Sequence, residues 1–235
     1  MSRLASSPFE TEITGHPMGR LTVTDEPPSL EELVARARTD GMRHLVATVD
    51  ATAYDTADAL AGLGFALVDV GVTFARAPEP GRGGHPRVRE ATLADRPDIE
   101  ARCAPIFRTS RYYRDSFFTE AQADEVHRRW IANSFAGRAA RIFVADDDAG
   151  RAGGFITLLV DDAARVGRIE LLGVATDAGG RGLGAGLVDA SLGWLAGRVE
   201  RVLVKTQSTN FRAANVYERA GFVLAQSDLT YSLRL

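Results

Sequence analysis

The chain contains one cysteine and one lysine among its 235 residues. A lone cysteine excludes an intrachain disulfide, and the apolar residues around Cys103 favour a small core side chain over a nucleophile. Apart from Lys205 the basic residues are all arginines, and 28 basic against 31 acidic residues leave a net charge of −3. Because that charge provides no overall attraction for nucleic acid, we expect no nucleic-acid partner.

Long apolar runs and metal-ligand spacings are missing as well. No apolar run reaches the ~20 residues that a membrane-spanning helix needs. Residues 1–17 also lack the apolar centre of a secretory signal. The four histidines show no HxxxH spacing and no CxxC pair accompanies them, so we expect no metal site. With 45% hydrophobic and 25% charged residues, the composition is typical of a globular protein, and we expect a cytoplasmic enzyme without membrane contacts.

A proline- and glycine-rich stretch divides the chain. Residues 77–87 contain three prolines and three glycines, a composition that favours an extended linker over a packed element. We therefore predict a small α/β domain at 1–76, a linker at 77–87 and a larger domain at 88–235. The first domain is close to the minimum size for independent stability, so we expect it to lean on the second.

Alternating and helical patterns predict the elements of both domains. In the first domain they predict strands at 19–24 and 43–50, one or two strands at 65–76 and a helix at 52–63. In the second domain they predict strands at 87–91, 140–145, 153–160, 167–175, 201–206, 222–225 and 229–233, and helices at 182–195 and 211–219. An exposed edge on the last strand would support a homodimer.

Capping residues mark further helix starts. Ser29 with Glu32 and Thr119 with Gln122 form capping-box patterns, in which each side chain bonds the other's backbone N–H. Thr92 also precedes a helix that runs to about residue 103. These patterns predict one helix in the first domain and two early in the second.

A glycine-rich turn joins a predicted strand to a predicted helix. Residues 169–174 are a nearly continuous apolar run, as expected for a strand covered on both faces. In the helix that follows, Leu187 and Trp194 continue an apolar stripe. The turn between them consists of Gly179, Gly180, Arg181, Gly182, Leu183 and Gly184.

Such a turn is typical of a phosphate site, because glycines let a ligand approach backbone N–H groups at the positive end of a helix. Arg181 would add a charge-assisted contact. The P-loop pattern fails, since Ala185 and Gly186 stand where it needs lysine and then serine or threonine. The dinucleotide pattern GxGxxG fails from either starting glycine. A turn that binds nothing is the alternative.

Residues 210–222, NFRAANVYERAGF, form a second pattern. Ala213, Val216, Tyr217 and Ala220 share one helical stripe, which stops at Gly221. Spacing alone fits Tyr217 equally well as a core aromatic and as a residue of a site.

Together the two segments resemble the GCN5-related N-acetyltransferase (GNAT) superfamily over about residues 88–235. That family carries an R/Q-x-x-G-x-G/A loop, which Gly182 and Gly184 match, whereas Gly179 stands at the usual basic position. Its second motif, N-x-x-A-x-x-x-Y-x-x-x-G-F, is matched at Asn210, Ala213, Tyr217, Gly221 and Phe222.

A finer resemblance is to the TDP-fucosamine N-acetyltransferase group, whose members carry an extra N-terminal α/β domain. The segments ALAGLGFALVDVGVTFAR, SRYYRDSF and TQSTNFRAANVYE are similar to segments of that group. Phe9 replaces an early tryptophan of the group.

The resemblance implies an α/β fold of the GNAT type, with a mixed central sheet, a splayed parallel strand pair and a small N-terminal α/β domain. Acetyl-CoA would be the co-substrate. Its binding residues would be Leu172, Gly173, Val174, the loop residues Gly179, Gly180, Arg181, Gly182, Leu183 and Gly184, and Asn210 and Ala213. Tyr217 would donate a proton to the departing sulfur, since a phenol with a pKa of ~10 stays protonated at neutral pH.

The general base is open between Asp69 in the first domain and Glu170 beside the acetyl site, and either fits a solvated carboxylate equally well. The substrate-binding candidates are Arg111, Tyr112, Tyr113 and Gln207. A guanidinium with neighbouring aromatic rings suits a phosphorylated sugar.

We therefore expect an N-acetyltransferase that acts on a small-molecule primary amine, and the finer resemblance implies a nucleotide-linked amino sugar. A peptide α-amine, a polyamine or an antibiotic is an alternative acceptor. A non-catalytic acetyl-CoA-binding module is the alternative from another functional class.

Overall fold

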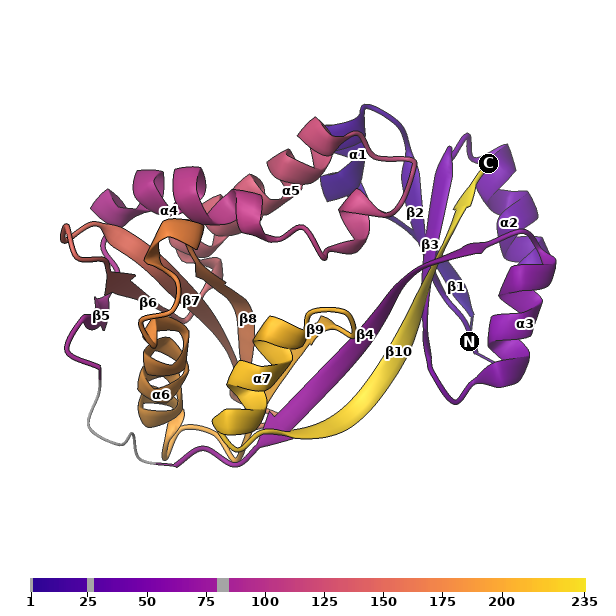
Figure 1. The fold of residues 1–235 in the computed structure, drawn as a ribbon. Coiled ribbons are helices and arrows are strands. Elements are labelled where there is room, and N and C mark those ends of the chain that lie inside the picture. The colour runs from indigo at the N-terminus through magenta and orange to yellow at the C-terminus, as the bar shows by residue number, and fades with distance from the viewer. Residues whose placement is uncertain (1, 25–27, 80–84) are drawn as a thin grey trace.

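The computed structural model describes residues 2–24, 28–79 and 85–235. Within these ranges the strands form one mixed sheet in the order β1-β2-β3-β10-β4-β9-β8-β7-β6-β5. The molecule is elongated, and the long strands β4 and β10 cross its middle (Figure 1). The sheet is therefore continuous through both predicted domains.

The described residues of the N-terminal part form four strands and three helices. Its elements are β1 (Arg3–Ser6), α1 (Pro8–Thr14), β2 (Met18–Thr22), α2 (Leu30–Thr39), β3 (His44–Asp50), α3 (Tyr54–Gly62) and β4 (Ala66–Arg76). Leu33 of α2 and Leu60 of α3 are buried with Leu45 of β3 in one apolar cluster. Sequence patterns did not predict β1 or α1, although α1 begins with Pro8, a residue favoured at the first position of a helix.

The last strand, β10 (Val223–Arg234), is a single long strand. The sequence predicted two strands, at 222–225 and 229–233, because polar residues separate them; the structure has one strand, with an irregular register between Leu224 and Gln226. β10 pairs antiparallel with both β3 and β4. The prediction of an exposed edge on this strand is therefore wrong, because hydrogen-bonded neighbours occupy both its sides. Among the described strands, β1 and β5 lie at the sheet edges.

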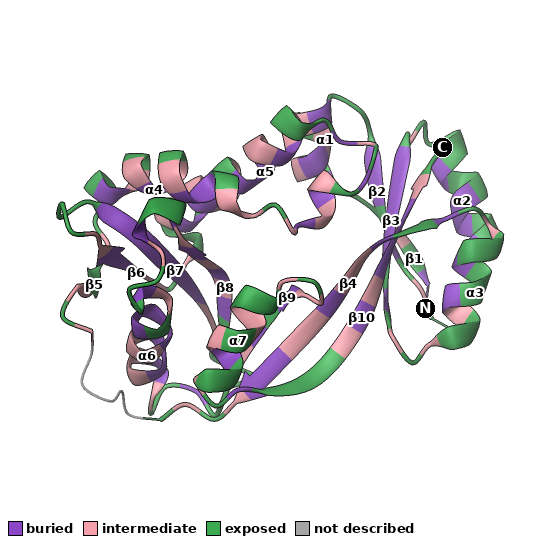
Figure 2. Ribbon diagram, in the orientation of Figure 1, coloured by how far each residue is buried: buried purple, intermediate pink, exposed green. Residues whose placement is uncertain are grey.

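The C-terminal part sandwiches its strands between helices. It comprises β5 (Val88–Glu90), α4 (Arg96–Cys103), α5 (Glu120–Asn133), β6 (Arg141–Asp146), β7 (Ala152–Asp161), β8 (Val166–Val174), α6 (Leu183–Leu195), β9 (Arg201–Gln207) and α7 (Phe211–Arg219). Helices α4 and α5 lie on one side of β6–β8, and α6 lies on the other (Figure 1). Buried residues fill the strands and the helix faces turned toward them (Figure 2).

The parallel pair β8 and β9 separates partway along. Paired residues run from Val166 with Arg201 to Ile169 with Val204. Beyond them β8 continues to Val174 and β9 to Gln207 without pairing with each other. The splayed strand pair expected from the resemblance is therefore present.

The two predicted capping boxes are present in the structure. The hydroxyl of Ser29 accepts a bond from the Glu32 N–H at 3.2 Å, and the Glu32 carboxylate accepts one from the Ser29 N–H at 2.8 Å. Thr119 and Gln122 make the same reciprocal pair at the start of α5. Both helix starts depend on residues three positions apart, so they could be predicted without tertiary information.

The predicted linker at 77–87 falls between β4 and β5, and its residues 80–84 lie outside the described ranges. The division of the chain at this point into two domains stays a prediction. None of the described helices combines the length and the apolar character that crossing a bilayer requires.

Candidate active site

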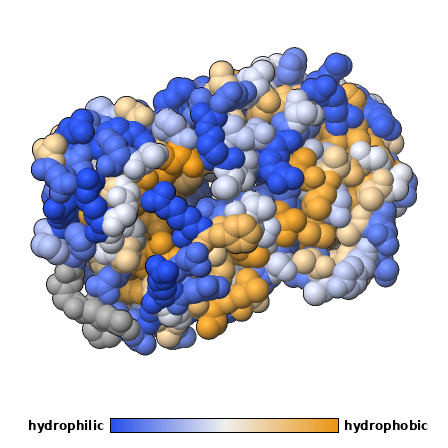
Figure 3. Space-filling view, in the orientation of Figure 1, coloured by the Kyte–Doolittle hydropathy of each residue, from blue (hydrophilic) through white to orange (hydrophobic). Residues whose placement is uncertain are grey.

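A long cavity of about 1350 Å³ passes through the gap between β8 and β9. Gly180, Gly182 and Gly184 line one end, and Thr48 and Thr230 line the other. On the molecular surface the region is a hollow bordered by hydrophilic and hydrophobic side chains (Figure 3). The cavity thus connects the glycine-rich turn to the polar face of the N-terminal strands.

Two backbone N–H groups of β8 point into the gap between β8 and β9. The N–H of Ala175 donates to the Gly153 carbonyl at 2.8 Å, and the N–H of Leu171 donates to Thr157 Oγ1 at 3.1 Å, both on the β7 side. Because successive amides of a strand alternate in direction, those of Leu172 and Val174 point toward β9, which has already diverged. They are donors available to a ligand in the gap.

Two features of β8 shape this opening. The register with β7 shifts between Thr157 and Leu158, so Glu170 is the extra residue of a β-bulge. At Gly173 an added Cβ would lie 2.9 Å from the Phe155 ring and 3.0 Å from the Ile106 side chain. Leu172 and Val174 line the cavity, whereas Gly173 allows close packing on the opposite face.

The glycine-rich turn has the backbone geometry of an anion-binding site. Gly180 and Gly182 have φ values of +79° and +74°, which a residue with a Cβ adopts at a cost of about 1–2 kcal/mol. The first helical bond of α6 runs from the Gly186 N–H to the Gly182 carbonyl, so the amides of Leu183 and Gly184 have no intrahelical acceptor. These amides and the helix dipole favour a phosphate group, so the residues present fit the diphosphate of a coenzyme A.

Arg181 is directed elsewhere. Its guanidinium donates to the Asp177 carbonyl at 3.0 Å and forms an ion pair with Asp148 at 3.1 Å. It is not among the residues that line the cavity. The structure therefore gives no support to the predicted phosphate contact of Arg181.

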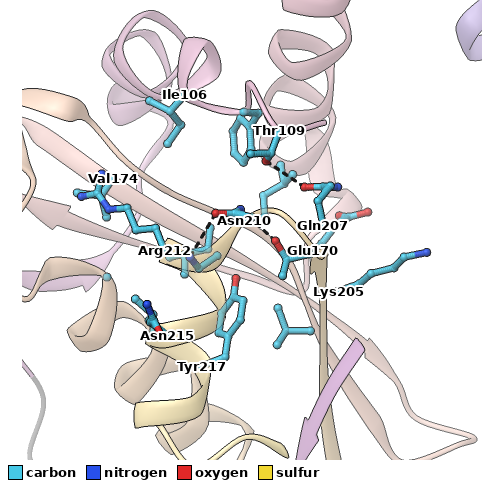
Figure 4. Close-up of a pocket in the computed structure, with 18 of the residues that line it drawn as sticks. Ile106, Thr109, Glu170, Val174, Lys205, Gln207, Asn210, Arg212, Asn215 and Tyr217 are labelled. Carbon is cyan, nitrogen blue, oxygen red and sulfur yellow. Dashed lines mark hydrogen bonds between the residues drawn. The ribbon is translucent and has the colours of Figure 1, made fainter. Parts of the chain in front are cut away.

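Tyr217 projects from α7 into the middle of the cavity. Its side chain is buried between Phe74 and Phe222, with ring centroids 6.1 and 5.9 Å away. Its hydroxyl is directed toward Asn210 and Glu170 (Figure 4). Burial raises the pKa of Tyr217 above its usual value, so the phenol is protonated at neutral pH.

Asn210 and Ala213 join the same wall of the cavity. The side chain of Asn210 caps α7 by accepting a bond from the Ala213 N–H at 3.3 Å. Its amide nitrogen donates to Thr206 Oγ1 at 3.0 Å. Asn210 thus fixes the start of the helix that carries Tyr217.

The two candidate bases differ in their surroundings. Glu170 accepts a bond from Arg138 at 3.0 Å, which ties its carboxylate to a guanidinium. Asp69 is half-buried on β4, and desolvation raises its pKa above the usual range, against the opposing effects of a hydrogen bond with Gln207 and the charge of Lys205. Both side chains line the cavity.

The segment predicted to bind the acceptor is anchored to the N-terminal part. Arg111 forms an ion pair with Glu10 at 3.1 Å, and the Tyr112 hydroxyl donates to the same carboxylate at 3.0 Å. Tyr113 bonds Asp124 at 2.5 Å and does not line the cavity, whereas Arg111 and Tyr112 do. Tyr113 was predicted to bind the acceptor, but the structure places it outside the cavity lining, against Asp124.

Gln207 lies where the acceptor segment meets β9. Its side-chain oxygen accepts a bond from Thr109 Oγ1 at 3.2 Å, and it lines the cavity (Figure 4). Cys103, by contrast, is fully buried, and desolvation raises its pKa to about 12, so it offers no thiolate.

Several residues of the cavity wall were not predicted from the sequence. Arg20, Thr48 and Thr230 line it from three different strands, and the hydroxyls of Thr48 and Thr230 are 3.1 Å apart. Only the pairing of β3 with β10 brings them together, so no local signal could have found them. Arg212 lies inside the motif at 210–222, where a basic residue in the first turn of a helix was a usable signal.

Comparisons with known proteins identify similar chains among acetyltransferases. The model of the acetyltransferase (GNAT) family matches residues 106–222. The chain is 34% identical over 100 residues to a mycothiol acetyltransferase of Salinispora tropica, covering 40% of this chain and 33% of that protein. It is 30% identical over 140 residues to the spore coat polysaccharide biosynthesis protein SpsD of Bacillus subtilis, covering 58% of this chain and 47% of that one.

A solved structure shares the fold over nearly the whole chain. The GCN5-related N-acetyltransferase from Sphaerobacter thermophilus superposes with a TM-score of 0.67 at 16% sequence identity, covering 99% of this chain and 76% of that one. This chain spans less than half the length of the two curated relatives described above.

Proposed function

We propose that this chain, which matches the acetyltransferase (GNAT) family over residues 106–222, transfers an acetyl group from acetyl-CoA to a primary amine. One observation carries this proposal. The gap between β8 and β9 presents the inward amides of Leu172 and Val174 on one side and the hydroxyl of Tyr217 on the other. Acetyl-CoA would supply the reactive thioester, with its diphosphate on the glycine-rich turn.

Each residue of the gap has a role in the transfer. The amine nitrogen attacks the acetyl carbonyl carbon, and the amides of Leu172 and Val174 stabilise the negative charge that develops on the carbonyl oxygen. The carbon–sulfur bond then breaks, and Tyr217 protonates the departing sulfur. The amine must lose a proton to a base. We assign this role to Asp69, since Arg138 already binds the carboxylate of Glu170.

The acceptor amine would bind on the polar face at the far end of the cavity. Thr48, Asp69 and Thr230 offer hydroxyl and carboxylate groups there, and Gln207 adds an amide. Arg20 and Arg111 bring guanidinium groups to the same end. Hydroxyl and amide groups suit a polyhydroxylated ligand, and guanidinium groups suit phosphate.

These features favour a nucleotide-linked amino sugar, as in the TDP-fucosamine N-acetyltransferase group. The printed name of the relative SpsD refers to polysaccharide biosynthesis, which is compatible with a sugar acceptor. Other relatives are named mycothiol acetyltransferases, so the acceptor differs among similar proteins. A peptide α-amine, a polyamine and an antibiotic are the competing acceptors.

Release of free thiol from acetyl-CoA in the presence of an amine panel tests the proposal. The panel contains a nucleotide-linked amino sugar, the unlinked amino sugar, a peptide, a polyamine and an aminoglycoside. We expect the highest kcat/KM with the nucleotide-linked sugar. A rate only with another amine would reject this acceptor class, and binding of acetyl-CoA without any transfer would indicate a non-catalytic module.

A further inference from the structure

We propose that Arg212 of α7 supplies the cation that binds the diphosphate of acetyl-CoA at the glycine-rich turn. The inference rests on the proposed use of acetyl-CoA and adds a residue that the loop motif does not contain. Arg212 lines the cavity, and its side chain extends from the start of α7 toward Val174 at the end of β8 (Figure 4).

The guanidinium of Arg212 lies directly against Gly179, the position at which the loop motif usually has a basic residue. A Cβ added to Gly179 would lie 2.8 Å from Arg212 Nη2 and 3.9 Å from Arg212 Cζ. The backbone of Gly179, with φ −64° and ψ 164°, is one that any residue adopts. The guanidinium of Arg212 therefore occupies the space beside residue 179, and a side chain there would displace it.

The charge of Arg212 is also available to a ligand. Among the described residues no carboxylate forms an ion pair with it, whereas Arg181 is paired with Asp148. The guanidinium stands beside the turn whose amides face the cavity. A guanidinium and several amides that converge on one point form a strong site for a phosphate group.

Binding of a ligand series by calorimetry tests this assignment. The ligands are coenzyme A, dephospho-coenzyme A, which lacks the 3′-phosphate, and pantetheine, which lacks the diphosphate. For Arg212→Ala we expect about tenfold to a hundredfold weaker binding of both nucleotide ligands. Pantetheine should bind as tightly as to the unaltered protein.

Two other arginines serve as comparisons. Arg36→Ala, on the exposed surface of α2 and paired with Asp40, should leave all three dissociation constants unchanged. A loss for Arg181→Ala with none for Arg212→Ala would assign the role to the loop arginine and overturn the inference. A loss for Arg212→Ala with coenzyme A but not with dephospho-coenzyme A would place the guanidinium on the 3′-phosphate and also overturn it.

A double variant tests whether an arginine at residue 179 can replace the guanidinium of Arg212. In Gly179→Arg combined with Arg212→Ala, the new side chain starts in the space that the old guanidinium leaves. We expect this double variant to regain most of the lost affinity for coenzyme A. If the double variant binds coenzyme A no better than Arg212→Ala does, an arginine at residue 179 cannot take over the role of Arg212.

The failure of this inference can be separated from that of the proposed function. If the unaltered protein binds no coenzyme A, the proposed function fails. If it binds coenzyme A and Arg212→Ala binds it equally well, only the role of Arg212 fails. Unfolding temperatures of all variants, measured in parallel, verify that each variant is folded.

Discussion

Ile169 and Val204 are the last residues paired between the parallel strands β8 and β9. The next residue of β8, Glu170, lies in the bulge against β7, and beyond it the two strands diverge. The amides of Leu172 and Val174 are therefore left without strand partners beside an open cavity. A continuous ladder would have used these donors and closed the gap, so the bulge and the divergence together create the site.

Tyr217→Phe should lower kcat by about a hundredfold while the affinity for acetyl-CoA changes little. The substitution removes the proton donor for the thiolate but keeps the ring between Phe74 and Phe222, and general acid catalysis contributes about 10²–10⁴-fold. Steady-state thiol release and calorimetry measure the two quantities. An unchanged kcat would remove the phenol from the mechanism.

Asp69→Asn should abolish the acidic limb of the pH profile of kcat/KM. A base acts only when it is deprotonated, and desolvation raises the pKa of Asp69, so activity should fall with decreasing pH at values above the usual ~4 of an aspartate. Glu170→Gln is the matched comparison. Loss of the limb in Glu170→Gln and its persistence in Asp69→Asn would assign the base to Glu170.

Gly182→Ala should weaken binding of acetyl-CoA as well as stability. Its φ of +74° imposes a cost of about 1 kcal/mol on alanine, and the altered turn no longer presents its amides correctly. Gly197 has a φ of +75°, and it does not line the cavity. Gly197→Ala should therefore show a similar loss in urea unfolding with unchanged acetyl-CoA affinity. Equal binding by both variants would argue against the turn as the diphosphate site.

Asp115→Ala should lower the free energy of unfolding at pH 7 by about 3 kcal/mol, because it leaves His44 without its buried partner. His44 Nε2 lies 2.9 Å from Asp115 Oδ2, and both side chains are buried. Urea unfolding measures the effect. Asp40→Ala, in an exposed pair with Arg36, should change stability little.

The same pair predicts a pH dependence of stability. Burial acts to raise the pKa of Asp115, but interactions with His44, Phe117 and Ser232 hold the pKa below the usual value. A carboxyl with a depressed pKa in the folded state stabilises the fold above its unfolded pKa of about 4 and loses this contribution as the pH falls further. Stability should therefore decline below about pH 4, and less steeply in Asp115→Ala. Parallel declines would contradict the assignment.

Some features could be predicted because their causes lie within a few residues. The capping boxes of Ser29 and Thr119 need only a partner three positions along the chain. The glycines of the turn at 179–184 are required partly by local backbone angles. The bounds predicted for α7, 211–219, agree with the structure because an asparagine cap and a terminal glycine enclose an apolar stripe.

Backbone angles, caps and periodicity act over short distances, so the type of most elements and the residues of the turn and of α7 could be read from local sequence. Which strands are neighbours depends instead on the packing of the complete fold. This packing placed β10 between β3 and β4, and so brought Thr230 beside Thr48. It also laid Arg212 over Gly179. Such contacts join residues far apart in the chain, and their free energy depends on the packing of the whole sheet, which no short segment encodes.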